Sequence, residues 1–162
     1  MSRANRVSKL SVLLLATGFL MAINACDNRQ EFAKYNGIEV DGWDKSQVSI
    51  FDVPPIKVSG DYNQMIGVRI TADYPFLTLS IIVDQTVFPS LKTTTDTLNC
   101  VVIDESGKHL GQGQNLWQQT FFLKRSTLQE GDSIHVAVRH NMRRDILEGI
   151  SDIGLIIEKT EQ

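Results

Sequence analysis

Short segments of alternating apolar and polar residues recur along the chain, and this pattern limits the folds that it can adopt. Successive side chains of a β-strand point to opposite faces, so such alternation predicts strands with one buried face. The segments lie at 47–53, 65–71, 77–83, 93–103, 116–123, 133–139 and 152–159, separated by turn residues such as Pro, Gly, Ser and Asp. The series predicts an all-β fold, an antiparallel β-sandwich of jelly-roll or immunoglobulin-like type with about seven to eight strands. A short helix is expected at residues 141–147.

The first residues of the chain have the features of an export signal. Three cations, Arg3, Arg6 and Lys9, precede the uncharged run 10–26. This run is too short for a comfortable transmembrane helix, which needs about 20 apolar residues. The motif Ile23-Asn24-Ala25-Cys26 is similar to a bacterial lipobox, whose cysteine is acylated and becomes the first residue.

These features divide the chain into three parts. We predict a signal peptide over 1–25, an acylated Cys26 with a polar tether over 26–35, and a single β-sandwich domain over 36–162. The alternative is an ordinary signal peptide that leaves Cys26 as a free thiol. Acyl chains on Cys26 would anchor the domain in membrane lipid, because each buried CH₂ contributes about 0.8 kcal/mol.

The charge of the mature chain argues against some partners. Removing residues 1–25 leaves 137 residues and changes the net charge from −3 to −6, because the removed segment contains three cations and no acids. An acidic domain is a poor ligand for nucleic acid, whose phosphates require cationic patches. We therefore expect no nucleic-acid partner.

Cys100 lies in the apolar segment 98–103, which reads as a strand. If Cys26 is acylated, Cys100 has no partner for a disulfide within the mature chain. A free thiol in an oxidising compartment is safe when it is buried, so we predict that Cys100 belongs to the core.

Two sets of side chains are candidates for binding. Trp43, Tyr74 and Trp117 are possible ligand aromatics, although core or edge packing is the favoured interpretation of Trp43. Arg139, Arg143 and Arg144 form a cationic cluster in an acidic domain and are a possible contact for an anionic partner. The alternative for this cluster is a solvated face balanced by neighbouring acids.

The chain offers no recognisable catalytic or metal-binding constellation. It contains no GxSxG, HExxH or paired-cysteine motif, and His135 and His140 should lie on opposite faces of one strand. The motif Gly111-Gln112-Gly113 lacks the third glycine and the helix of a dinucleotide site, and a bulge or close backbone approach explains it better. We therefore expect no enzyme activity, no catalytic residue, no metal and no cofactor.

Several motifs, in this order and spacing, resemble the GldH family of gliding-motility lipoproteins of Bacteroidetes. They are Gly42-Trp43, Asp73-Tyr74-Pro75-Phe76, Asp96-Thr97-Leu98-Asn99-Cys100 and Leu147-Glu148-Gly149-Ile150, together with the lipobox leader. The resemblance implies a cell-envelope lipoprotein of the gliding and associated secretion machinery, without enzyme activity.

Two functions are compatible with these observations. The first is a non-enzymatic interaction or structural component, held at the outer membrane by its acyl chains and contacting other envelope proteins. The alternative is a glycan-binding surface lipoprotein with a jelly-roll domain, which would require exposed aromatic side chains.

Overall fold

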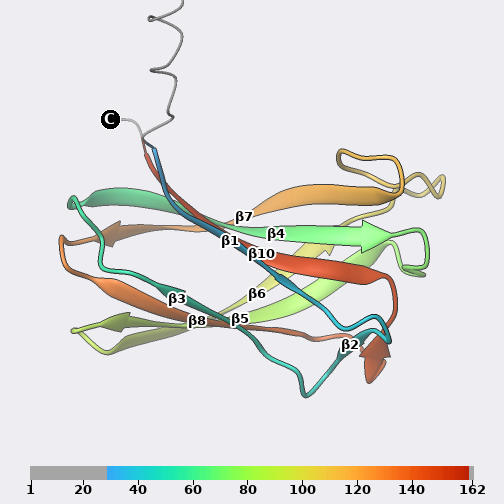
Figure 1. Ribbon diagram of the computed structural model, residues 1–162, viewed down its shortest axis with the longest axis horizontal. Helices are drawn as coiled ribbons and strands as arrows, with labels where there is room; N and C mark the ends of the chain where they lie inside the picture. The colour runs from blue at the N-terminus through green and yellow to red at the C-terminus, as the bar shows by residue number, and fades with distance from the viewer. Residues whose placement is uncertain (1–28, 161–162) are drawn as a thin grey trace, which may run out of the picture.

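The computed structural model describes residues 29–160, which form two antiparallel sheets packed face to face (Figure 1). The first sheet has the strand order β1-β10-β4-β7 and the second has the order β3-β8-β5-β6. A small third sheet pairs β2 with β9. The strands are β1 (Gln30–Gly37), β2 (Trp43–Asp44), β3 (Ser49–Val53), β4 (Gly60–Thr71), β5 (Thr78–Phe88), β6 (Lys92–Val101), β7 (Leu116–Leu128), β8 (Ser133–His140), β9 (Ile146–Leu147) and β10 (Ile150–Lys159).

The all-β prediction is confirmed, and each predicted strand overlaps one of β3, β4, β5, β6, β7, β8 and β10. The predicted helix at 141–147 is wrong. Those residues form a turn followed by β9, whose Leu147 pairs with Trp43 of β2. Between residues 29 and 160, no helix is long and apolar enough to span a membrane.

The predicted tether over 26–35 is wrong for its second half. Residues 30–37 form β1, an edge strand that pairs with β10 from Gln30↔Glu158 to Gly37↔Asp152. Phe32 of this strand packs against the core. The described domain therefore begins six residues earlier than the predicted boundary at residue 36, while the signal peptide and Cys26 lie outside the described residues.

Apolar side chains from the inner faces of both sheets form the core. In β3, Phe51 and Val53 face inward, while Ile50 faces outward and is partly exposed. Cys100 is fully buried, and this burial raises the pKa of its thiol to about 12. Cys100 is therefore a core residue, as predicted.

Three connections lie together at one end of the sandwich, at the left in Figure 1: the loop 54–59, the turn 89–91 and the loop 129–132. The strand registers place the beginning of β1 at the same end, because Gln30 pairs with Glu158 and Glu158 pairs with Asn63 near the start of β4. We call these three connections, with the first residues of β1, the entry end.

Candidate functional site

The predicted ligand aromatics do not form a surface platform. Trp43 is fully buried, donates a hydrogen bond from Nε1 to the Gln47 carbonyl (3.1 Å) and meets the His140 ring edge-on. Tyr74 is also buried, and its hydroxyl donates to the Thr78 carbonyl (2.9 Å). The prediction that these two rings bind a ligand is wrong, because both rings are buried in the core.

Trp117, the third predicted aromatic, is partly buried on the inner face of β7. Its ring stacks on His109 with a centroid distance of 3.9 Å and an interplanar angle of 15°. Since His109 covers one face of the indole, that face is not open to a sugar.

The His140 ring, which packs against Trp43, is also buried. This burial lowers the pKa of His140, although backbone hydrogen bonds with Asp145 and Trp43 raise the same pKa.

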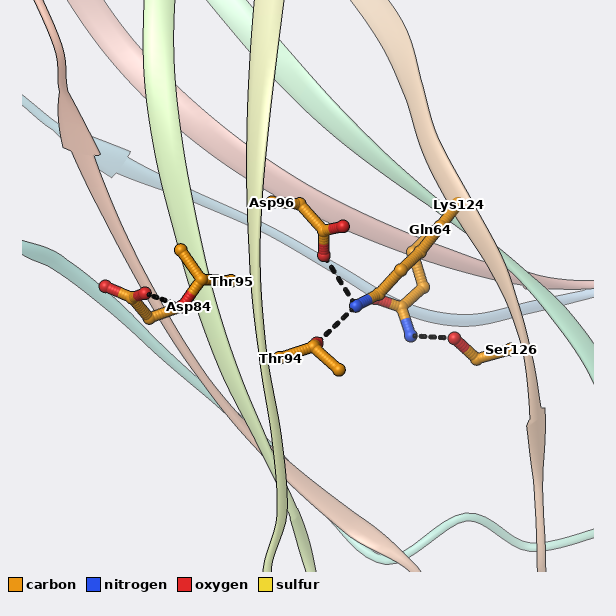
Figure 2. Close-up of polar contacts among 7 residues, drawn as sticks. All are labelled: Gln64, Asp84, Thr94, Thr95, Asp96, Lys124 and Ser126. Carbon is orange, nitrogen blue, oxygen red and sulfur yellow. Dashed lines mark hydrogen bonds and ion pairs between the residues drawn. The ribbon is translucent and has the colours of Figure 1, made fainter.

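The predicted arginine cluster divides between a strand and a turn. Arg139 lies on the outer face of β8 and forms an ion pair with Asp84 of β5. Asp84 also accepts a hydrogen bond from Thr95 Oγ1 (2.6 Å; Figure 2), and these two contacts lower the pKa of its carboxyl group. Arg143 and Arg144 are exposed in the turn before β9. These two arginines remain a predicted partner contact.

The outer face of the β1-β10-β4-β7 sheet carries a tyrosine laid across two glycines. Tyr35 pairs with Gly154, which pairs with Gly67 on the next strand. A Cβ on Gly67 would lie 2.3 Å from the Tyr35 hydroxyl oxygen, and one on Gly154 would lie 2.6 Å from the ring. The Arg69 guanidinium lies 4.0 Å from the ring centroid and is hydrogen-bonded to Gln118. The ring is therefore held flat on the sheet, with the two glycines below it and the Arg69 guanidinium over it in a cation–π contact.

An apolar row crosses all four strands next to this tyrosine. Residues paired in register point to the same face, and the register here is Ala33↔Ile156↔Met65↔Phe122. Phe122, at the β7 end of the row, is 57% exposed, whereas Ile156 on β10 is 8% exposed. We call these four residues the apolar row. On either side of it lie polar pairs, Asn63–Arg125 and Arg69–Asp152.

A polar network joins the two sheets where β6 and β7 face each other (Figure 2). Lys124 of β7 reaches across and donates to Thr94 Oγ1 (2.6 Å) and to Asp96 Oδ2 (2.7 Å) of β6. Beside it, the fully buried Gln64 donates from Nε2 to Ser126 Oγ (3.1 Å). Polar side chains therefore line the interior along this side of the sandwich.

A pocket of about 410 Å³ opens beside this network at the entry end. Gln85 of β5 lines it and is only 2% exposed, yet its Nε2 has no hydrogen-bond partner within residues 29–160. Such unpaired buried groups are rare in native proteins and need an explanation. Most of the lining is uncharged, and its charged residues, Lys92, Lys124 and Arg125 against Asp132, carry a net positive charge.

The apolar row and the pocket were not predicted from the sequence. A signal for the pocket was present, because Gln64 and Gln85 occupy inward positions of strands whose other inward residues are apolar. The signal for the row was weaker, since it requires knowing which strands are neighbours.

Comparisons with known proteins show the family of the chain. The model of the GldH lipoprotein family matches residues 30–157. The chain is 29% identical to the gliding motility lipoprotein GldH of Flavobacterium johnsoniae, covering 96% of this chain and 99% of that protein. It is 26% identical to a GldH homologue of Christiangramia forsetii, covering 88% of this chain and 91% of that one.

Solved structures give weaker similarity. A GH115 4-O-methyl-α-glucuronidase with specificity for decorated arabinogalactans matches with a TM-score of 0.42 at 10% identity, over 84% of this chain and 18% of that enzyme. This likeness carries no argument about function. The family model, by contrast, matches most of the chain, and the chain belongs to the GldH lipoprotein family.

Proposed function

We propose that this protein is a non-enzymatic interaction component of the gliding and associated secretion machinery, held at the outer membrane through acylated Cys26. Family membership supports the lipoprotein and motility parts of this proposal. The apolar row supports the interaction part, because it places Met65 and the exposed Phe122 on an open sheet face.

The apolar row has the composition of a protein-binding surface. Aromatic residues, Met and Arg are enriched in protein interfaces, and a polar rim commonly surrounds the apolar centre. Here Phe122 and Met65 would form the centre, and Arg69 would lie at the rim. Arg69 is already oriented by Tyr35 and Gln118, so binding would require little additional ordering of its side chain.

Replacing Phe122 with serine should reduce recovery of partner proteins at least tenfold after crosslinking in the native host. The reason is that central aromatic side chains commonly contribute about 2 kcal/mol or more to binding. Because Phe122 is 57% exposed, we expect the variant to fold and to reach the membrane fraction. Quantitative mass spectrometry of the crosslinked, purified protein provides the measurement.

The matched control is Val101→Ser, which removes an exposed apolar side chain from β6, on the other sheet. Its partner recovery should equal that of the wild type. The double variant Arg143→Ala/Arg144→Ala tests the predicted arginine contact in the same assay. Unchanged recovery for Phe122→Ser would contradict docking through the apolar row.

A second candidate function is binding of a glycan, and the pocket beside Lys124 is the observation that favours it. The unpaired Nε2 of Gln85 offers a donor to a sugar hydroxyl or carboxylate, and the net positive charge of the lining favours acidic sugars. This site replaces the aromatic platform that the sequence suggested.

Glycan binding can be separated from folding by the variant Gln85→Leu. This near-isosteric change removes the unpaired buried amide, so stability should be unchanged or higher, while glycan binding should be lost. A glycan array rich in uronic acids, followed by calorimetry on any hit, measures binding. Gln114→Leu, in an exposed connection, is the control and should bind like the wild type. Absence of binding by the wild-type protein would exclude this second function.

A further inference from the structure

The turn between β5 and β6, at the entry end, exposes large apolar side chains. Leu91 is 66% exposed and Phe88 is 41% exposed. Leu91 also has a φ of 56°, a left-handed backbone conformation that is unfavourable for residues other than Gly, Asn and Asp. Asn or Gly would relieve this strain and avoid exposing a leucyl side chain to water. Leucine at position 91 therefore favours folding neither through its backbone conformation nor through burial of its side chain.

A second apolar side chain, Val58, is presented at the same end by a braced loop. Val58 is 53% exposed. On one side of it, Ile56 is buried and exchanges backbone hydrogen bonds with the loop 129–132. On the other side, the Val58 carbonyl accepts a hydrogen bond from the Tyr62 hydroxyl (2.6 Å). The loop therefore holds the Val58 side chain outward in a defined position.

The chain enters the domain at this same end, close to the proposed lipid anchor. Arg29 is the first described residue, and its carbonyl accepts a hydrogen bond from the Lys159 amide (2.7 Å). Three residue steps separate Cys26 from Arg29, and a chain of that length spans at most about 11 Å. An acylated Cys26 would thus keep the beginning of β1 next to the lipid surface.

We propose that the entry end of the sandwich rests on the membrane, with Leu91, Phe88 and Val58 inserted at the boundary between headgroups and acyl chains. This inference rests on the proposed acylation of Cys26. Lys57 and Lys92 adjoin these apolar residues in sequence, and the long stems of lysine suit such a boundary, where the ammonium stays with the headgroups. Contact at this end gives the domain one orientation and leaves the loops of the opposite end pointing away from the lipid.

A depth measurement with single introduced cysteines tests this orientation. The acylated protein carrying Leu91→Cys or Val58→Cys is labelled with an environment-sensitive fluorophore and reconstituted in phosphatidylethanolamine/phosphatidylglycerol vesicles. Cys100 should not react, because it is buried and its thiol pKa is raised to about 12. The control is Val40→Cys, an equally apolar and fully exposed position on the connection that follows β1, at the opposite end.

We expect labels at 91 and 58 to shift to shorter emission wavelengths and to lose most of their emission to lipid-borne quenchers, while the label at 40 is unaffected. A wavelength shift without lipid quenching would indicate contact with protein and would overturn the proposal, as would water-like emission at all three positions. Leu91→Asn should retain or increase thermal stability and reduce quenching of the label at 58.

The anchor is tested separately, by fractionating cells that express Cys26→Ser. Recovery of this variant in the membrane fraction, together with absence of a lipid-modified Cys26 peptide in the wild type, would refute the anchor and the proposed orientation. A released variant combined with unquenched labels in the acylated protein would refute the orientation alone. Neither result depends on the recovery of partner proteins, which tests the apolar row.

Discussion

Replacing Trp43 with alanine should lower the free energy of unfolding by about 3–5 kcal/mol, the usual cost of removing a large buried aromatic side chain. Trp43 is fully buried and contacts the His140 ring, and its Nε1 donates to the Gln47 carbonyl. It also lies on β2, so its loss would weaken the small sheet that pairs β2 with β9. Urea denaturation followed by circular dichroism measures the change.

Trp43→Phe and Trp117→Ala serve as controls for this prediction. Trp43→Phe keeps most of the buried volume and loses the hydrogen bond, so it should cost less than Trp43→Ala. Trp117→Ala removes an indole of equal size that is only partly buried, and should also cost less. A loss below about 1 kcal/mol for Trp43→Ala would show that Trp43 does not have the structural role assigned to it.

The strands could be predicted because their signal is local. Segments such as 133–139 alternate strictly, and β8 has the same alternating burial in the structure. β1 could not be predicted in this way, because its sequence QEFAKYNG is largely polar and its stability comes from pairing with β10. The fit of Tyr35 onto Gly67 and Gly154 depends on glycines far along the chain, which no local pattern reveals.

The difference between local sequence patterns and contacts of distant segments also explains which parts of the candidate sites could be predicted. The sequence identifies residue types that can bind ligands, such as Trp43 and Tyr74, but their exposure depends on which segment covers them. Trp43 lies on β2, which pairs with β9 in a region where a helix was expected, and its ring packs against His140. The apolar row likewise arises from strand order, because its members come from four strands that are not consecutive in sequence. The inward glutamines were the one site feature visible in local sequence.

Replacing Gly149 with alanine should lower the free energy of unfolding by about 3 kcal/mol or more, from two causes that act together. Its φ of 77° is unfavourable for alanine, which costs about 1–2 kcal/mol. In addition, a Cβ at this position would lie 2.2 Å from the backbone nitrogen of Tyr74, an overlap that requires the backbone to move. Such movement would also disturb the hydrogen bond from the Thr71 amide to the Gly149 carbonyl (2.8 Å).

Gly107→Ala isolates the first of these causes. Gly107 has a similar φ of 84°, but no atom lies within 4 Å of the position where its Cβ would be. It should therefore cost only the conformational part, about 1–2 kcal/mol. The difference between the two variants, measured by urea denaturation, gives the energetic cost of the close approach between Gly149 and Tyr74. Equal losses would mean that the turn moves away from Tyr74 freely, and that the burial of Tyr74 does not depend on a glycine at position 149.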